Sequence, residues 1–424
     1  MNIVGLITEY NPFHKGHEYH IKKAKELTGA DACVVIMSGN YVQRGTPAFM
    51  DKHTRTAIAL EHGADLVFEL PVPFSCASAE YFATAAVTLL HKMGVITHIC
   101  FGAECDDIDK LKNIAAVLAD AKSDNIHPVN LYIKENVKSG MSYASARSNA
   151  VAKYLSDDYA SLLDTPNNIL ALEYLKALKL LHSDIVPVAI TRTKASYHDN
   201  EANDRLYSAS SVRAALMSNV TTDDSCDVLN ELYSFSDEYR LTLGKTAPIT
   251  EDDFSNILCE KLLSLCLSDI TDNALTEYMG VDRDLANRIA NRDILLKHTV
   301  FSDLTEALKT KNIAYTSVSR ALLAVILGIT SADVEAYINN GISSYIRLLG
   351  FRKNSSAILN DIKKIGALTI IGQLSEMSGN NTLTEHDKKM LSHSIYCDEL
   401  YNMIVRYKYK CDFPNEYKRK IIIQ

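Results

Sequence analysis

The first half of the chain alternates short hydrophobic runs with longer amphipathic stretches. The hydrophobic runs are NIVGLI, ACVVIMS, DLVFELP, THICFGAE and IVPVAI, and amphipathic stretches such as DKHTRTAIALEHG and SAEYFATAAVTLLHKMG lie between them. Short apolar runs of this kind are typical of buried parallel strands, and the amphipathic stretches are typical of crossover helices. The pattern therefore predicts an α/β fold with a doubly wound, mainly parallel sheet.

The second half has a different pattern. From about residue 216 the strand-like runs become rare, and segments such as NILCEKLLSLCLSDI and SRALLAVILGI have helical periodicity. The polar stretch TTDDS at residues 221–225 suggests a boundary close by. We therefore predict an α/β domain over residues 1–220 and a mainly α-helical domain over residues 221–424.

Composition narrows the class of protein. A chain of 424 residues with 47% hydrophobic and 23% charged content is typical of a soluble globular protein. Because no signal peptide or long apolar span is present, we expect a cytoplasmic protein without a membrane partner. Its nine cysteines form no C-x-x-C pair, so we expect reduced thiols and no metal site built from them. A net charge of −8 disfavours indiscriminate binding of nucleic acid, so an RNA partner would need a local basic surface.

The stretch EYNPFHKGHEYH follows the first predicted strand and carries three histidines. Pro12 disfavours a helical Asn11, and the segment after Phe13 has the pattern of a helix, which puts His14 and His17 in its first turn. A helix start attracts anions, two imidazoles add hydrogen-bond donors, and a glycine between them lets a ligand approach the backbone. These features favour a phosphate site.

Two other interpretations of the same histidines stay open. His14, His17 and His20 lie along one stripe of the predicted helix, so they could bind a metal ion, although a catalytic zinc site usually adds an acidic ligand. They could also be a structural cluster that caps the helix.

Two ordered motifs resemble those of the HIGH nucleotidyltransferase superfamily. One is HKGH at residues 14–17, and the other is SASSVR at residues 208–213, whose key residues are Ser208, Ser210 and Arg213. The stretches ITEYNPFHKGH, SGNYVQRG, GADLVFELP, SAEYFA, CFGAE, PNNIL and SYHD, in this order, resemble more narrowly the bacterial tRNA(Met) cytidine acetate ligase family. YIRLLGF at residues 345–351 extends the resemblance into the second half.

This resemblance implies a two-step reaction. ATP and acetate would give acetyl-adenylate and pyrophosphate, and the acetyl group would pass to the N4 amine of the wobble cytidine of elongator tRNA(Met), forming N4-acetylcytidine. We expect Mg²⁺ to accompany the ATP, and we expect no obligate protein partner. A small-molecule adenylyltransferase of cofactor synthesis and a nonenzymatic RNA-binding protein on the same fold remain as alternatives.

The resemblance also assigns site residues. His14 and His17 would be catalytic, and the ATP site would comprise Ile7, Thr8, Glu9, Tyr10, Asn11, Pro12, Phe13, His14, Lys15, Gly16, His17, Glu18, Tyr19, His20, Gly102, Asn167, Arg192 and Thr193. In the SGNYVQRG segment, possible contacts to acetate or the target base are Ser38, Asn40, Gln43 and Arg44. That segment could equally be a structural turn.

Basic residues in the second half are candidates for binding the tRNA. They occur in KTKNIAYTSVSR and IRLLGFRKN, with tyrosines nearby, and the residues singled out are Lys311, Arg320, Arg352 and Lys353. Basic side chains supply most RNA affinity through phosphates, and aromatic rings stack exposed bases. The alternative is that these residues lie on solvated helix faces balanced by neighbouring acids.

Overall fold

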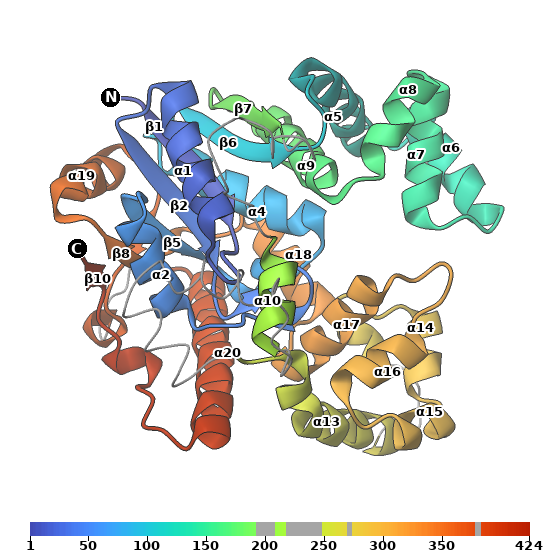
Figure 1. The fold of residues 1–424 in the computed structure, drawn as a ribbon. Helices are drawn as coiled ribbons and strands as arrows, with labels where there is room; N and C mark the ends of the chain where they lie inside the picture. Colours follow the sequence, from blue (N-terminus) through green and yellow to red (C-terminus); the bar gives the residue numbers. More distant parts are fainter. Residues whose placement is uncertain (192–207, 218–247, 269–273, 378–382) are drawn as a thin grey trace.

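The computed structural model describes residues 1–191, 208–217, 248–268, 274–377 and 383–424. Figure 1 shows a central sheet, helices on both of its faces, and two helical groups that project to one side. Arg192 and Thr193 lie outside the described residues. No helix within the described ranges is long and apolar enough to cross a membrane.

The central sheet has eight strands in the order β10-β8-β5-β2-β1-β6-β7, with β9 paired to β8. The pairs β1–β2, β1–β6, β2–β5 and β6–β7 are parallel, as predicted. The predicted fold class is therefore confirmed. The strands are β1 (Ile3–Thr8), β2 (Ala32–Ser38), β5 (Leu66–Leu70), β6 (His98–Ala103), β7 (Val186–Thr191), β8 (Tyr345–Phe351), β9 (Thr369–Ile371) and β10 (Ile422–Ile423).

Three of these strands come from the second half of the chain. β8 is the YIRLLGF stretch, which pairs antiparallel with β5, and β9 and β10 pair parallel with β8. The sequence did not predict these strands, because they lie among helical segments. The sheet thus includes residues from both sides of the predicted boundary near residue 220, and the division into two domains stays a prediction.

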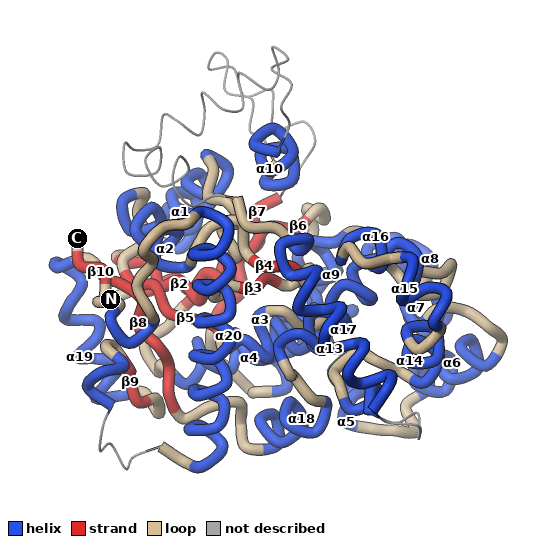
Figure 2. Tube along the Cα trace, turned by 90° about the horizontal axis from the view of Figure 1, so that it is seen from below, coloured by secondary structure: helices blue, strands red, loops and turns tan. Residues whose placement is uncertain are grey.

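Helices cover both faces of the sheet (Figures 1 and 2). On one face, buried side chains of α1, α2 and α10 pack on the strands, and the larger core on the other face includes α4, α9, α17 and α20. The helices are α1 (Lys15–Thr28), α2 (Lys52–Glu61), α3 (Val72–Ser75), α4 (Ala79–Lys92), α5 (Ile108–Ser123), α6 (Pro128–Lys138), α7 (Tyr143–Tyr154), α8 (Asp157–Ala160), α9 (Pro166–Leu180), α10 (Ala209–Met217), α13 (Ser255–Ser268), α14 (Arg283–Ile289), α15 (Arg292–Lys297), α16 (Phe301–Leu308), α17 (Tyr315–Leu327), α18 (Ser331–Asn339), α19 (Ser356–Ile365) and α20 (Glu385–Tyr409).

The loops after β1, β2 and β6 all leave the carboxyl ends of parallel strands. Ligands of doubly wound sheets bind at this edge. The loop after β2 contains a small hairpin, in which β3 (Tyr41–Val42) pairs antiparallel with β4 (Thr46–Pro47). The predicted SGNYVQRG loop is therefore partly a hairpin, and it lies at the same edge as the histidine motif.

Candidate active site

His14 and His17 form the N-terminal cap of α1. The His14 Nδ1 accepts a hydrogen bond from the Gly16 amide at 3.1 Å, and the His17 Nδ1 accepts one from the His14 amide at 3.3 Å. The two rings lie face to face, with their centroids 3.8 Å apart and a tilt of 31°. The capping interpretation is thus correct as far as it goes, because the histidines satisfy backbone amides at the helix start.

The same hydrogen bonds fix the tautomer of both rings. A backbone N–H can only donate, so each Nδ1 must present its lone pair. A neutral His14 or His17 therefore carries its proton on Nε2, where it can be donated to an anion. Capping and phosphate binding are compatible, because they use opposite nitrogens of each ring.

Gly16 has a role that the sequence did not indicate. A Cβ added at Gly16 would lie 2.8 Å from Cε1 and 3.0 Å from Nδ1 of His14. Any larger residue would therefore displace the capping imidazole. The glycine is needed for the placement of His14, whatever space it also leaves for a ligand.

A metal site at the histidine stripe is disfavoured by the hydrogen bonds of its members. Backbone amides donate to the Nδ1 atoms of His14 and His17, so each neutral ring carries its proton on Nε2, and a protonated nitrogen has no lone pair to offer a metal ion. Within the described residues, no group of three or more His, Cys, Asp or Glu side chains has the arrangement of a metal site.

The second sequence motif lies against the first. The Arg213 guanidinium in α10 donates to the Asn11 backbone carbonyl at 2.6 Å, and Ser208 caps α10 by accepting from the Ser211 amide. Ser208 and Ser210 also share a hydroxyl hydrogen bond. The SASSVR element thus supports the backbone of the histidine loop.

Arg55 joins the two predicted ligand loops, although no motif in the sequence singles it out. It is fully buried at the first turn of α2 and donates to the backbone carbonyls of Glu9, Ser38, Gly39 and Met50. One guanidinium therefore holds the ends of β1 and β2 together. A motif search could not reveal this contact, because the acceptors are main-chain atoms.

Glu9 adds a second link between the loops. Its Oε1 accepts from the Gln43 amide at 2.7 Å, so Gln43 is tied to the histidine loop through its backbone. Burial raises the pKa of the Glu9 carboxyl, while the Gln43 hydrogen bond and the nearby Arg44 charge oppose this effect. Other predicted loop residues face elsewhere: Glu18 pairs with His62, and Tyr19 is exposed.

The four residues predicted in the SGNYVQRG segment fall into different environments. Asn40 is buried, and both ends of its amide bind within the protein, to Asp398 and to the Lys52 amide. Arg44 is exposed. The Ser38 hydroxyl is fully buried and has no hydrogen-bond partner among the described residues. Asn40 therefore has the structural role that was the alternative, and a ligand contact by Ser38 stays a prediction.

Gly102 and Asn167 lie at neighbouring points of the sheet edge. Gly102 is in β6, and Asn167 is in the first turn of α9, as predicted. Glu104 connects them, because its carboxylate accepts from the Asn167 side-chain amide and from the Asn168 backbone amide. Glu104 thus occupies the start of α9, and it was missed because a single acidic residue after a strand carries no motif.

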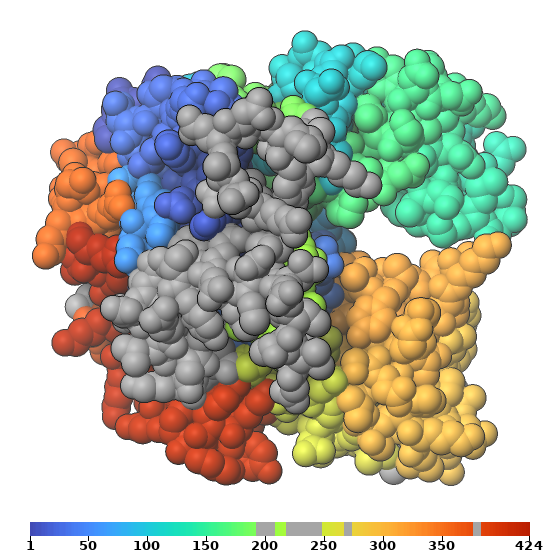
Figure 3. All heavy atoms as spheres, viewed as in Figure 1, coloured from blue at the N-terminus to red at the C-terminus, as the bar shows by residue number. Residues whose placement is uncertain are grey.

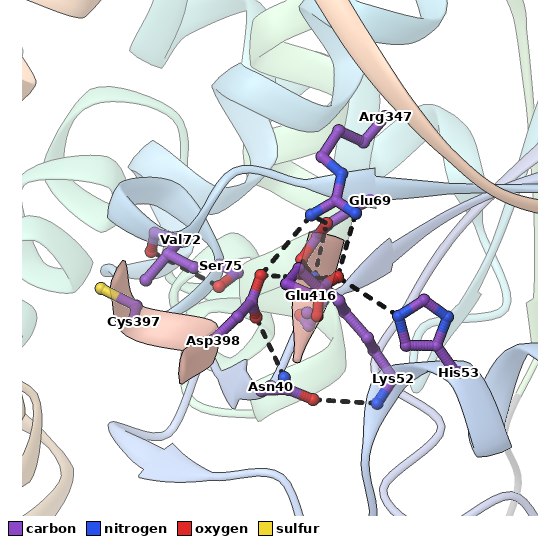
Figure 4. Close-up of polar contacts among 12 residues, drawn as sticks. Asn40, Lys52, His53, Glu69, Val72, Ser75, Arg347, Cys397, Asp398 and Glu416 are labelled. Carbon is purple, nitrogen blue, oxygen red and sulfur yellow. Dashed lines mark hydrogen bonds and ion pairs between the residues drawn. The ribbon is translucent and has the colours of Figure 1, made fainter. Parts of the chain in front are cut away.

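A buried ion network lies beneath the hairpin (Figure 4). Lys52 contacts Glu69, Asp398 and Glu416 at 2.8, 2.5 and 3.0 Å, and Arg347 contacts the same three carboxylates. These side chains come from α2, β5, β8, α20 and the C-terminal turn. The network therefore ties residues far apart in the sequence to the hairpin through Asn40.

Three carboxylates and two permanent cations leave this network one negative charge in excess. Burial raises the pKa of Asp398 well above its usual value. Burial acts on Glu416 in the same direction, but the charges of Lys52 and Arg347 outweigh it and hold the pKa of Glu416 well below its usual value.

The four basic residues predicted to bind tRNA do not form one surface. Arg320 lies beside Gly45 of the hairpin, and Arg352 donates to the carbonyls of Leu60 and Glu61 at the end of α2. Lys311 and Lys353 are exposed. Lys311 precedes α17 and Lys353 follows β8, and these two elements lie on opposite sides of the molecule in Figures 1 and 2. A role of these residues in RNA binding stays a prediction.

Known proteins resemble this chain over nearly its whole length. A family model described as HIGH Nucleotidyl Transferase matches residues 1–415. The tRNA(Met) cytidine acetate ligase of Clostridium novyi is 37% identical over 96% of this chain and 97% of the relative. The protein of the same name from Acetivibrio thermocellus is 33% identical over 100% of both chains.

A solved structure is similar as well. The crystal structure of Thermotoga maritima TmcAL bound with alpha-thio ATP superimposes with a TM-score of 0.84 and 26% identity, over 100% of this chain and 99% of that one. The chain therefore belongs to the HIGH nucleotidyl transferase family and, within it, to the tRNA(Met) cytidine acetate ligases.

Proposed function

We propose that this chain is an ATP-dependent ligase that acetylates the wobble cytidine of elongator tRNA(Met) at N4, with acetate as the acyl source. The observation that carries the proposal is the pair of imidazoles at the start of α1, whose neutral tautomers carry the proton on Nε2. The names of relatives that align end to end with this chain support the choice of substrates.

The proposed ATP site is the edge of the sheet between β1 and β6. The triphosphate binds at the start of α1, and Gly102 and Asn167 contact the nucleoside. Arg213 and Arg55 act indirectly, by holding the loop backbone. Mg²⁺ would accompany the triphosphate and neutralise part of its charge.

In the first step an acetate oxygen attacks the α-phosphorus of ATP. A new O–P bond forms as the bond to the β-phosphate bridging oxygen breaks, and pyrophosphate leaves. Negative charge gathers on phosphoryl oxygens in the transition state, where His14, His17 and the first amides of α1 can donate to it. No protein nucleophile is needed.

In the second step the cytidine N4 amine attacks the acetyl carbonyl carbon of acetyl-adenylate. AMP leaves with the electron pair of the broken C–O bond, and the amine loses a proton. Because this amine is a weak nucleophile, holding it against the mixed anhydride supplies much of the catalysis. Ser38 is proposed to contact the acetate carboxylate, since its buried hydroxyl has no partner among the described residues. The reaction is placed in the cytoplasm, where tRNA and ATP occur.

The test is ATP–pyrophosphate exchange with a panel of small carboxylic acids and no tRNA. We expect exchange that depends on acetate and is weaker with longer acids. Exchange that needs no carboxylate, or that needs a different phosphate acceptor, would point instead to a small-molecule adenylyltransferase.

A further inference from the structure

The hairpin of α6 and α7 differs in charge from the rest of the chain. Residues 126–154 contain four basic residues (Lys134, Lys138, Arg147 and Lys153) and one acidic residue, Glu135, which gives a net charge of 4 − 1 = +3, against −8 for the whole protein. Lys134, Lys138 and Lys153 are exposed. The hairpin is therefore a local basic surface on an acidic protein.

The same hairpin also exposes an unusual share of apolar and aromatic side chains. Of twenty exposed large hydrophobic residues in the described part of the chain, six lie between residues 126 and 154, namely Ile126, Leu131, Val137, Met141, Tyr143 and Tyr154. Concentrated exposed apolar surface marks an interaction site. Positive charge mixed with tyrosine is the combination that binds RNA, in which phosphates meet cations and bases stack on rings.

A cavity of about 280 Å³ lies at the base of the hairpin, between α4, α5, α6, α7 and α9. Four cationic side chains, Lys122, Lys134, Arg147 and Lys176, line it together with Glu80 and Tyr143. Lys122 and Lys176 both pair with Glu80, and Arg147 pairs with Glu173 behind the wall. Even with both acids counted, the charge around the cavity is 4 − 2 = +2.

Arg147 has donor capacity left over. Its Nη1 binds Glu173 at 2.9 Å, but its Nε is buried without a hydrogen-bond partner among the described residues. The charges of Lys176 and Lys122 outweigh the effect of burial on Glu80 and lower its pKa to about 2, as expected beside concentrated positive charge. An anionic group such as a phosphate would satisfy this pocket.

The α6–α7 hairpin lies beside an open notch in the molecular surface (Figure 3). The other wall of the notch is the lobe of α14 to α16, and the segment that follows this lobe carries the exposed Lys311. A polyanion lying in the notch would meet basic residues of the α6–α7 hairpin. An apolar protein partner would gain nothing from this excess of positive charge.

We propose that the α6–α7 hairpin, with the cavity at its base, is a docking surface for the tRNA, in which the cavity takes a backbone phosphate and Tyr143 stacks a base. This surface rests on the proposed function, because it needs a tRNA substrate. It lies apart from the histidine loop at the start of α1, so binding there leaves the activation of acetate untouched.

The test compares the charge reversal K134E/K138E with the matched control K363E/K364E, two adjacent exposed lysines on α19. If Lys134 and Lys138 each contact one phosphate, K134E/K138E should lower the affinity for tRNA(Met) at least about tenfold. It should also make the slope of log affinity against log salt shallower by roughly one to two. The control should change affinity less than about twofold, and tRNA-free ATP–pyrophosphate exchange should match the parent in both variants, which shows that they fold.

A third variant, Tyr143→Ala, probes the stacking contact. It should weaken tRNA binding at least about fivefold, the lower end of base–aromatic stacking, and leave the salt slope unchanged. Equal tRNA affinity and slope in the parent and K134E/K138E, or an equal loss in the control, would overturn the surface while the proposed function stands. Failure of the parent itself to bind tRNA(Met) would overturn both.

Discussion

His14 and His17 combine two tasks that are usually assigned to different residues. Each ring accepts a backbone hydrogen bond through Nδ1, which caps α1, and each neutral ring carries on Nε2 the proton that is proposed to face the triphosphate. Removal of either ring therefore disturbs the protein twice. A substitution that preserves the cap but removes the donor separates the two effects.

His14→Asn makes this separation, because asparagine is among the best N-cap residues. We expect the free energy of unfolding to stay within about 0.5 kcal/mol of the parent, whereas acetate-dependent exchange should fall by at least about 2 kcal/mol in activation free energy, comparable to the loss of one oxyanion donor. His14→Ala should lose both stability and activity.

Urea unfolding and exchange kinetics measured on the same preparations check this prediction. Near-parental exchange by His14→Asn would mean that the ring serves only as a cap.

A substitution at Ser38 tests the proposed acetate contact at the end of β2. Because its buried hydroxyl has no partner among the described residues, Ser38→Ala should cost little stability. Loss of one hydrogen bond to a carboxylate, worth about 1.5 kcal/mol or more, should raise the KM for acetate roughly tenfold and leave the KM for ATP unchanged. An unchanged KM for acetate would place the carboxylate elsewhere.

Among the secondary-structure elements, the β3–β4 hairpin is held against the sheet by the ion network of Figure 4. Lys52 begins α2, Glu69 lies in β5, Arg347 lies in β8 and Asp398 lies in α20. Asn40 connects this network to the β3–β4 hairpin. Each partner is needed because every charge is buried. The network therefore links the second half of the chain to the β3–β4 hairpin.

Lys52→Met should destabilise the protein by about 3–5 kcal/mol, because it leaves three buried carboxylates with one cation. Adding Asp398→Asn removes one of these charges. The double variant should therefore lose less stability than the sum of the single variants, by about 1 kcal/mol or more. Strictly additive losses in urea unfolding would show that the two residues are not coupled.

His53 makes one part of the stability depend on pH. Burial lowers the pKa of His53, the charges of Lys52 and Arg419 act in the same direction, and the hydrogen bond that His53 donates to Glu416 opposes them. Below about pH 6.5 the unfolded chain protonates this histidine before the folded chain does, so the unfolded state binds more protons and stability falls as pH falls. The opposite sign would require a raised pKa.

His53→Gln keeps a donor to Glu416 but cannot titrate. The stability advantage of the parent over this variant should therefore be largest near pH 8 and shrink toward pH 5, while the other titrating groups cancel in the difference. Urea titrations at several pH values measure it. A difference that stays constant or grows toward pH 5 would contradict the lowered pKa.

The sequence predicted the elements whose patterns are local. β1, β2 and β5 were visible as apolar runs, and the motif HKGH was placed correctly at a helix start. β8 was missed, because its pairing with β5 joins residues almost 280 positions apart, such as Glu69 and Arg347. Arg55 and Lys52 were missed for a related reason: an isolated charge usually lies in solvent, and only the folded chain shows that these two are buried.

In the molecule as a whole, both halves of the chain build one sheet and meet at the β3–β4 hairpin. Gly45, with φ of +81°, lies so close to the Arg320 backbone that a Cβ would clash at 2.4 Å, and Ser319 donates to its carbonyl. The helical elements therefore contact the candidate active site directly. This arrangement suits an enzyme that must bring a large substrate to a small activated acyl group.

In the proposed reaction, acetate reaches the tRNA through activation by ATP on this chain. The direct measurement is incubation of the protein with isotope-labelled acetate, ATP and elongator tRNA(Met), followed by nuclease digestion and mass spectrometry of the anticodon fragment. We predict labelled N4-acetylcytidine at the wobble position, only when ATP and acetate are both present, and none in a tRNA whose wobble cytidine is replaced by uridine. Active acetate-dependent exchange without any label in the tRNA would contradict acetyl transfer to the wobble cytidine.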